Sequence, residues 1–328
     1  MNIPELQGNV LITGGLGLVG SNLARRLANQ GVNVTILTPS LKNINNLQDI
    51  KDKVSIIQGE VQDFNKIQEL VKDKQHVFHL AGVGSHKSSM DNPFLDLDIH
   101  VKGTLNILEA CRKHSENANI VFSGTIRQAG VIENTYAKEE QYELPVSNYD
   151  AHRLLAEKHL RIYNKMYGLP TTTLRLSNIF GDGQYNTDIT LSPINHITKQ
   201  AVLGNTLKIY GDGGPLRDYN YVGNIVDALI VAADSKNTKG EFYITGSGQG
   251  KNFKQFMETL SRLIEGLYGR TVIIEKIAPP EGFEKTAQQD VIADYSKFNK
   301  ATGWVPRVSF EEGLKRTIEY YKKITSGA

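Results

Sequence analysis

A short glycine-rich stretch near the start of the chain has the residue types and spacing of a phosphate-binding turn. Residues 13–20 read TGGLGLVG, directly after the apolar run 10–12 and directly before a helix-like stretch at 21–30. Glycine permits the positive φ of a tight turn and lets a pyrophosphate approach the backbone closely. The unpaired N–H groups at the start of the following helix then favour an anion. Strand, glycine turn and helix in this order predict a binding site for a dinucleotide, NAD or NADP.

The elements that must position this turn alternate along the first half of the chain. The predicted strands are 9–13, 32–38, 54–58, 76–81, 118–123 and 171–176, and the predicted helices are about 18–30, 63–73, 92–114 and 147–168. Such alternation is typical of right-handed βαβ units and of a parallel sheet covered on both faces. The sequence therefore predicts an α/β protein with a doubly wound parallel sheet, the Rossmann arrangement, of about seven strands.

The texture of the sequence changes after about residue 178, where Gly, Asn and Tyr become more frequent and the elements shorter. We expect residues 1–178 to form the dinucleotide-binding Rossmann domain, to which about 220–248 return. Residues 179–219 and 249–328 are expected to form a smaller C-terminal substrate-binding lobe. The cofactor would then cross the carboxyl ends of the strands, and the substrate would lie in the cleft beside the lobe.

Composition and charge limit the class of protein. The chain has 328 residues, 40% of them hydrophobic and 22% charged, with a formal net charge of +2. These values are ordinary for a globular protein and lack the clustered basic excess of a nucleic-acid-binding protein. The single cysteine, Cys111, excludes an intrachain disulfide and a multi-cysteine metal site, and its apolar surroundings predict burial. Without a signal-like N-terminus or an apolar run of membrane-spanning length, we expect a cytoplasmic protein with no nucleic acid, membrane or metal partner.

Further motifs follow the glycine turn in a fixed order. They are GEVQD at 59–63, HLAG at 79–82, DIHVKGT at 98–104, RLSNIFGDG at 175–183, RDYNYV at 217–222, ADYSK at 293–297 and GWVP at 303–306. Between them, Tyr149 stands four residues before Arg153. In this order and spacing the motifs resemble the extended short-chain dehydrogenase/reductase family, and within it the nucleotide-sugar epimerases, dehydratases and 4-ketoreductases. The resemblance runs from residue 10 to about residue 313.

The resemblance implies which residues contact the cofactor. They are Gly14, Gly17, Leu18, Val19, Thr38, Glu60, Val61, Leu80, Ala81, Gly82, Tyr149 and Arg153. NAD-preferring members have an acid where this chain has Thr38, and that acid repels a 2′-phosphate. Its loss, with Lys42 nearby, admits NADP, whereas a Thr38 hydroxyl on the ribose fits NAD. Both cofactors therefore stay open.

The resemblance also implies the chemistry at the sugar. In this family a tyrosine exchanges a proton with a sugar hydroxyl or carbonyl while hydride passes to or from the nicotinamide. Tyr149 and Arg153 match that tyrosine and the lysine four residues after it, so both face the cofactor from one side of a helix. A unit charge about 4 Å away is worth about 4 kcal/mol at an effective dielectric near 20, which favours a phenolate. Arg153 can supply this charge, although a planar guanidinium lacks the compact ribose contact of lysine.

Thr125 is the third predicted catalytic residue, because it stands where the family places a hydroxyl beside the substrate oxygen. Ser123 is the alternative in another register, and a hydroxyl that merely caps the local backbone is the structural alternative. The 4,6-dehydratases continue with Asp and Glu, which protonate the leaving C6 hydroxyl and remove the C5 proton. This chain has Ile126 and Arg127 instead. Dehydration therefore lacks its acid and base.

These residues together predict an NAD(P)-dependent nucleotide-sugar epimerase, acting at C4 through a transient 4-keto sugar. A nucleotide-4-keto-sugar reductase or a 4,6-dehydratase-like enzyme is the alternative within the same class. Because the usual lysine is replaced, a non-catalytic protein that binds nucleotide or sugar stays open as an alternative of another class.

The substrate contacts implied by the resemblance lie on both sides of the expected cleft. They are Lys87, Thr125, Asn178, Tyr210 and Arg217. Arg217 matches a diphosphate-binding arginine, whose forked N–H groups suit phosphate. A second such arginine, usual before the ADYSK motif, has no counterpart, and Lys285 is the candidate substitute.

The two long predicted helices, 92–114 and 147–168, carry apolar residues on more than one face. One sheet face covers less than this, and the family commonly dimerises through a four-helix bundle, so we expect a homodimer through these helices. His100 lies in the first helix, where the family has asparagine. We expect it to be a buried, hydrogen-bonded histidine rather than a catalytic one.

Overall fold

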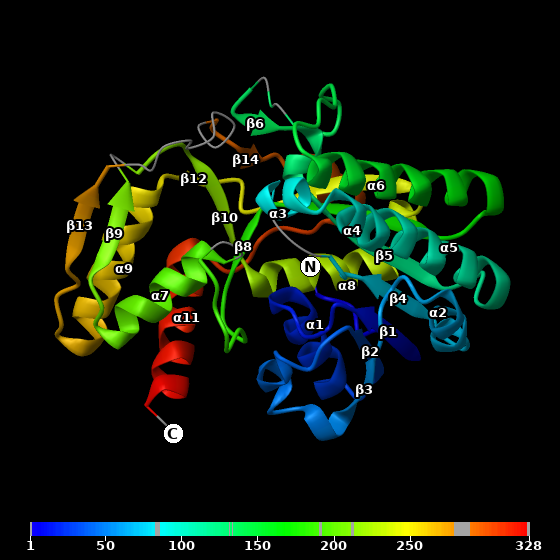
Figure 1. Cartoon of the computed structure of the whole chain (residues 1–328), viewed down its shortest axis with the longest axis horizontal. Coiled ribbons are helices and arrows are strands. Elements are labelled where there is room, and N and C mark those ends of the chain that lie inside the picture. The colour runs from blue at the N-terminus through cyan, green and yellow to red at the C-terminus, as the bar shows by residue number, and fades with distance from the viewer. Residues whose placement is uncertain are drawn as a thin grey trace.

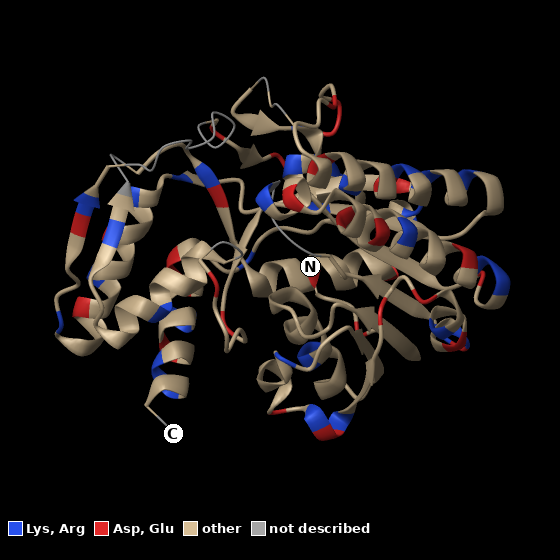
Figure 2. Cartoon of the chain, viewed as in Figure 1, with Lys and Arg blue, Asp and Glu red and all other residues tan. Residues whose placement is uncertain are grey.

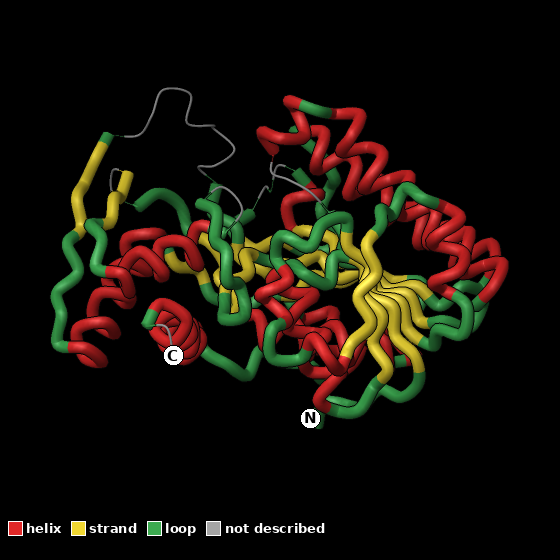
Figure 3. The backbone as a smooth tube through the Cα atoms, turned by 60° about the horizontal axis from the view of Figure 1, so that its bottom comes forward, coloured by secondary structure: helices red, strands yellow, loops and turns green. Residues whose placement is uncertain are grey.

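The computed structural model describes residues 2–82, 86–130, 132, 134–189, 192–210, 213–278 and 289–326. Its centre is a seven-stranded sheet in the order β11-β7-β5-β4-β1-β2-β3, with every neighbouring pair parallel. The strands are β1 (Asn9–Thr13), β2 (Asn33–Thr38), β3 (Val54–Gln58), β4 (His76–His79), β5 (Asn119–Thr125), β7 (Thr171–Leu176) and β11 (Glu241–Thr245). Figure 3 shows these strands side by side between the helices. The predicted doubly wound fold is confirmed, and the strand order reverses beside β1, where such folds bind their ligands.

Helices cover both faces of the sheet (Figure 1). One layer consists of α1 (Leu18–Asn29) and α8 (Val222–Asp234), which share a hydrophobic core with the sheet. The other layer consists of α2 (Phe64–Val71), α5 (Gly103–His114) and α6 (Asn148–Tyr167), which pack over a second core. Cys111 lies fully buried in that second core, as its apolar surroundings predicted. Both faces are thus apolar, which is why the central strands read as continuous hydrophobic runs.

The helix predicted at 92–114 is one helical path with three parts. It begins with α4 (Pro93–Leu97), where Asn92 caps the first turn by accepting from the backbone N–H of Leu95. A π-helical segment, Asp98–Lys102, follows and leads directly into α5. The π-helical turn is rare and shifts the faces of the helix relative to one another. A regular helical period could not have predicted it.

A smaller lobe lies at the other end of the chain (Figure 1). It contains α7 (Pro193–Leu203), α9 (Phe253–Tyr268), α11 (Phe310–Thr325) and the two-stranded sheet of β9 (Leu207–Tyr210) and β13 (Ile274–Ile277). A three-stranded sheet of β12 (Gly250–Lys251), β10 (Arg217–Tyr221) and β8 (Asn178–Phe180) lies beside it. A hydrophobic core of its own joins β8, β10 and the three helices.

The proposed domain boundaries stay a prediction, but the packing of particular segments bears on them. Helix α8 and Tyr243 of β11 belong to the same core as α1, in keeping with a return of the chain to the Rossmann part. Helix α10 (Ser296–Thr302) also belongs there, because Phe298 and the neighbouring Trp304 are buried in that core. The sequence analysis, in contrast, expects this segment in the lobe, within residues 249–328.

The charges of the chain are spread over the molecule. Lys and Arg alternate with Asp and Glu along the outer helices instead of gathering on one element (Figure 2). Of the helices within the described ranges, none combines the length and apolar character that a membrane span requires.

Candidate active site

The glycine turn joins the end of β1 to the start of α1. Gly14 has φ of +73°, and a Cβ there would lie 2.8 Å from the carbonyl oxygen of Leu80, so only glycine fits. Gly17 caps α1 without any side-chain hydrogen bond, and the helix therefore presents its first N–H groups uncovered. This cradle fits the pyrophosphate of a dinucleotide, with Leu18 and Val19 in the first turn of the helix.

The other predicted cofactor residues lie at the same edge of the sheet. Thr38 ends β2, Glu60 and Val61 follow β3, and Leu80, Ala81 and Gly82 follow β4. Parallel strands bring their carboxyl ends together, so these segments surround the glycine turn. The hydroxyl of Thr38 is buried and donates to the carbonyl of Ser40 at 2.9 Å, within its own turn. The choice between NAD and NADP stays open at this position.

Helix α6 carries both Tyr149 and Arg153 near its N-terminus. The Arg153 side chain is only 5% exposed, and its carbon Cζ lies 4.5 Å from the ring centre of Phe122. Nη1 lies 3.2 Å from Nδ1 of His100, and Nη2 lies 3.5 Å from Oγ of Ser123. Burial lowers the pKa of Arg153, while the negative charge available on Tyr149 raises it. Tyrosine and guanidinium are therefore close enough to interact electrostatically, and their joint action on cofactor and sugar stays a prediction.

Thr125 ends β5 and caps the short helix η4 (Ile126–Ala129). Its Oγ1 accepts from the backbone N–H of Arg127 at 3.3 Å, while Oε1 of Gln128 accepts from the backbone N–H of Thr125 at 3.0 Å. The hydroxyl thus fills the local capping role, and its proton can still be donated to a bound oxygen. Ser123, the alternative hydroxyl, is buried and directed toward Arg153 instead.

Arg217 begins β10 at the boundary of the lobe. Its Nη1 donates to the carbonyl oxygens of Leu216 and Gln289. Burial, followed by the positive charge of Arg127, lowers the pKa of Arg217 to about 10. The two guanidiniums therefore lie within electrostatic range of each other, and an anion bound there would relieve their repulsion.

The remaining predicted substrate residues lie on separate elements. Asn178 is exposed and pairs in register with Tyr219 across β8 and β10. Lys87 is exposed on α3 (His86–Asp91). This helix contacts the start of α6, because Oγ of Ser89 accepts from the backbone N–H of Tyr149 at 3.0 Å. The backbone of Tyr210 ends β9, but its side chain lies outside the described part of the structure, as does Lys285.

Comparison with known proteins decides the family. The model of the NAD dependent epimerase/dehydratase family matches residues 10–246. The chain belongs to this family. The predicted fold, the extended short-chain dehydrogenase/reductase group and an NAD-dependent enzyme of the epimerase/dehydratase type are thereby confirmed.

Individual relatives cover nearly the whole chain. A UDP-N-acetyl-alpha-D-glucosaminuronate decarboxylase from Bacillus cytotoxicus is 29% identical over 96% of this chain and 98% of its own length. A UDP-glucose 4-epimerase from Mycolicibacterium smegmatis is 27% identical over 95% of this chain and 98% of its own. The crystal structure of UDP-glucose 4-epimerase with UDP-glucose from Thermotoga maritima superposes with a TM-score of 0.83, at 26% identity, over 97% of this chain and 99% of that one.

The sequence analysis did not predict two groups of side-chain contacts around the candidate site. Gln128 donates to Glu157 at 2.6 Å, and Glu157 is bound by the buried Arg175, so the end of β5 is tied to α6 and β7. Oδ2 of Asp96, on α4, lies 2.7 Å from Nδ1 of His152, on α6. The capping-box spacing between Thr125 and Gln128 was a local signal for the first, but nothing local pointed to the second.

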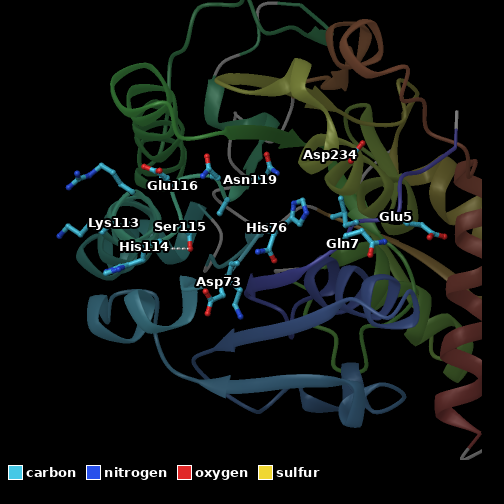
Figure 4. Close-up of a pocket in the computed structure, with 16 residues that line it drawn as sticks. Glu5, Gln7, Asp73, His76, Lys113, His114, Ser115, Glu116, Asn119 and Asp234 are labelled. Atoms are coloured by element: carbon cyan, nitrogen blue, oxygen red, sulfur yellow. Dashed lines mark hydrogen bonds between the residues drawn. The ribbon is translucent and has the colours of Figure 1, made fainter.

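A surface hollow of about 810 Å³ lies away from the glycine turn. His76 and Asn119 line it at the first residues of β4 and β5, with His114 and Glu116 from the segment that precedes β5 (Figure 4). These are the amino ends of the strands, opposite the edge that carries the cofactor residues. The hollow is therefore not the candidate active site.

Proposed function

We propose that this enzyme is an NAD(P)-dependent nucleotide-sugar epimerase that acts at C4 through a transient 4-keto sugar. The observation that carries the proposal is the pair formed by Tyr149 and the buried Arg153 on one side of α6. Tyr149 removes the proton of the C4 hydroxyl and later returns it, while the charge of Arg153 stabilises the phenolate. The hydroxyl of Thr125 donates a hydrogen bond to the same oxygen. NAD(P), held at the glycine turn, would supply a hydride acceptor and donor for C4 of the sugar.

The residues after Thr125 argue against dehydration. Ile126 is 2% exposed and belongs to a small hydrophobic cluster, and Arg127 carries a cation where a general base would have to act. Neither can protonate a leaving hydroxyl or remove a carbon-bound proton at neutral pH.

A 4-ketoreductase is the second candidate, and Thr38 is the observation that favours it. A reductase must exchange its cofactor with the cell, where NADPH is the usual reductant. The turn after β2 lacks the acid that would repel a 2′-phosphate, so such exchange with NADPH is admissible.

The substrate side of the proposal rests on Arg217 and Arg127. We propose that Arg217 binds the diphosphate of the nucleotide sugar and that Arg127 adds a second positive charge. The anion facing Arg127 is either the diphosphate or a carboxylate on the sugar, and a relative named for a glucosaminuronate substrate makes the second source concrete. Affinities of the Arg127→Gln variant for UDP, UDP-glucose and UDP-glucuronate distinguish them. Loss with all three ligands points to the diphosphate, and loss with UDP-glucuronate alone points to the carboxylate.

We also propose a homodimer through α4 and α6. Leu155, Ile162 and Met166 form one exposed stripe along α6, and Phe94 of α4 is 79% exposed beside it. Light scattering at micromolar concentration should give twice the chain mass, and Ile162→Glu with Phe94→Glu should halve it. Ile273→Glu, an equally apolar exposed position on the lobe, is the control that should leave the mass unchanged. A monomeric wild-type protein would refute the dimer.

The direct test of the function is a panel of nucleotide sugars incubated with the enzyme and NAD or NADP. An epimerase forms the C4 epimer without net change of cofactor absorbance. Stoichiometric consumption of NADPH with a 4-keto sugar would instead show a reductase, and binding without product would show a non-catalytic protein.

A further inference from the structure

A chain of buried polar groups runs behind the tyrosine and arginine of α6. Nδ1 of His152 lies 2.7 Å from Oδ2 of Asp96, and Oδ1 of Asp96 lies 3.5 Å from Nε2 of His100. Nδ1 of His100 then lies 3.2 Å from Nη1 of Arg153. The chain thus joins α4, the π-helical segment and α6, and it ends at the guanidinium beside Tyr149.

Burial makes these contacts consequential. Asp96 and His100 are 2% and 1% exposed, and Arg153 is 5% exposed. A buried cation needs partners to remain charged, and at its forked end Arg153 contacts a histidine and a serine hydroxyl. The carboxylate of Asp96 reaches it only across the imidazole ring.

The donor and acceptor rules fix the state of that imidazole. A guanidinium has only donors, so Nδ1 of His100 must accept from Arg153. The proton of the neutral ring then sits on Nε2, where it faces Asp96. At 3.5 Å from Nε2, Oδ1 of Asp96 makes no hydrogen bond to the ring, and its negative charge favours a proton on that nitrogen and this ring orientation electrostatically.

The backbone around the cluster has the shape that this arrangement needs. His100 follows Asp96 by four residues in the sequence. It lies in the π-helical segment, across from α6. A Cβ at Gly82 would lie 2.9 Å from Cε1 of His100 and 3.2 Å from Nη1 of Arg153, so the cluster backs directly onto the segment that follows β4. The ring of His100 also meets the ring of Tyr149 edge-on, with centres 5.5 Å apart.

We infer that His100, oriented by Asp96, is a positioning residue that fixes the Arg153 guanidinium beside Tyr149. A guanidinium is longer than the ammonium of lysine and can swing between several acceptors. The imidazole acceptor removes that freedom at Nη1, while Ser123 receives Nη2. The kinetic test of this inference rests on the proposed function, and the spectroscopic test does not.

The kinetic test uses His100→Ala in the full-length enzyme with bound cofactor. Misplacing a catalytic group by about 1 Å costs on the order of 10²-fold in rate, so kcat should fall by about that factor while KM for the nucleotide sugar hardly changes. His159→Ala, on α6 with Arg153 but outside the chain of contacts, should leave kcat unchanged. If His100 only fills space, the thermal midpoint falls and the kcat of the folded enzyme stays at the wild-type value, which would overturn the inference.

A double-mutant cycle shows whether His100 acts through Arg153. In the Arg153→Lys background the imidazole has no guanidinium to hold, so adding His100→Ala should change kcat by less than about threefold, within the scatter expected for uncoupled changes. An undiminished effect in that background would mean that His100 acts by another route. Asp96→Asn should lower kcat in the same direction as His100→Ala but by less.

The spectroscopic test needs no turnover. Long-range proton–nitrogen correlation spectra of the protein labelled with ¹⁵N-histidine, assigned with His100→Gln, report which ring nitrogen carries the proton. The inference requires the Nε2–H tautomer in the wild type and a mixed population in Arg153→Ala, which removes the donor to Nδ1. A doubly protonated or Nδ1–H ring in the wild type would overturn it. If no nucleotide sugar is converted but the tautomer is as expected, the proposed function fails and the positioning contact stands.

Discussion

Two buried arginines, Arg175 and Arg153, have different kinds of partner in this fold. Arg175, on β7, is fully buried and is bound by the carboxylates of Glu157 and Glu143. Arg153, on α6, is nearly as buried, yet its guanidinium contacts a histidine, a serine hydroxyl and an aromatic ring. Burial alone would lower both pKa values. The carboxylates reverse this for Arg175, whose pKa is raised, whereas that of Arg153 is lowered.

The difference separates a cation that ties elements together from one that, in the proposed mechanism, acts on Tyr149. A guanidinium held by two carboxylates has its field cancelled at short range, and it serves to tie β7, α6 and the end of β5 together. A guanidinium held by neutral acceptors keeps more of its field for the charges around it, among which Tyr149 has the largest effect on Arg153, ahead of Asp96 and Glu157. The fold thus stabilises one charge and leaves the other available.

The largest expected effect concerns the group that Arg153 serves. Tyr149→Phe removes the proton that positioned acid–base catalysis transfers, so kcat should fall by about 10²–10⁴-fold. The affinity for NAD(P), measured by calorimetry, should hardly change. Full activity of Tyr149→Phe would move the base elsewhere and leave the charge of Arg153 without a role in proton transfer.

Breaking the structural pair should be felt in stability instead. Glu157→Ala leaves the buried charge of Arg175 with Glu143 as its remaining carboxylate, and the free energy of unfolding should fall by up to about 3–5 kcal/mol. Denaturant unfolding measures it. Glu258→Ala, which breaks an exposed pair with Lys254, is the control and should have no measurable effect. Replacing Glu157 and Arg175 together by leucine should recover much of the loss, and a double variant as unstable as Glu157→Ala would contradict the assignment of Arg175 as a structural cation.

The next effect tests the third arginine, Arg217. Losing charge-assisted bonds typically costs about 1.5–3 kcal/mol, so Arg217→Ala should weaken binding of a nucleoside diphosphate by that amount and leave NAD(P) binding intact. Arg262→Ala, an exposed arginine paired with Glu311, is the calorimetric control. Equal losses for both ligands would show that Arg217 does not hold the diphosphate.

A smaller effect should appear in the dependence of stability on pH. His79 is buried between Thr13 and Thr104, at 2.8 Å and 3.1 Å, and burial, followed by the charge of Arg153, lowers its pKa from 6.5 to about 3. The unfolded chain therefore binds the proton between these values and the folded chain does not. Stability should fall by about 1.4 kcal/mol for each pH unit below 6.5, and His79→Gln should remove this part of the slope. An unchanged slope in the variant would show that His79 is protonated in the folded enzyme.

The order of elements and the glycine turn could be predicted from the sequence because each has a local signal. Alternating β-branched and amphipathic runs predicted six of the seven strands of the central sheet to within two residues, and TGGLGLVG marked the start of α1. The burial and hydrogen bonding of His100 were also expected correctly. Its partner Asp96 was not foreseen, because the contact depends on a π-helical turn that no propensity reveals.

The site contacts that could not be predicted join segments that lie far apart in the sequence. Arg175 and Glu157 come from different elements, and Arg127 approaches Arg217 from a segment 90 residues earlier in the chain (217 − 127). A single sequence carries no signal for such pairs, since each residue alone is an ordinary charged side chain. Packing of η4 against α6, and of the lobe against the sheet, is what brings them together.

The most direct test of the central claim follows a deuterium placed at C4 of the nucleotide sugar that the enzyme converts. The account predicts that both C4 epimers keep the deuterium at C4, with none lost to water and none released on free cofactor, because hydride leaves and returns within one closed site. Nuclear magnetic resonance of the product mixture reads this out. Replacement of the deuterium by solvent hydrogen would show epimerisation by proton abstraction, and its release on free NAD(P)H would show a net oxidoreductase. Either result would contradict the account.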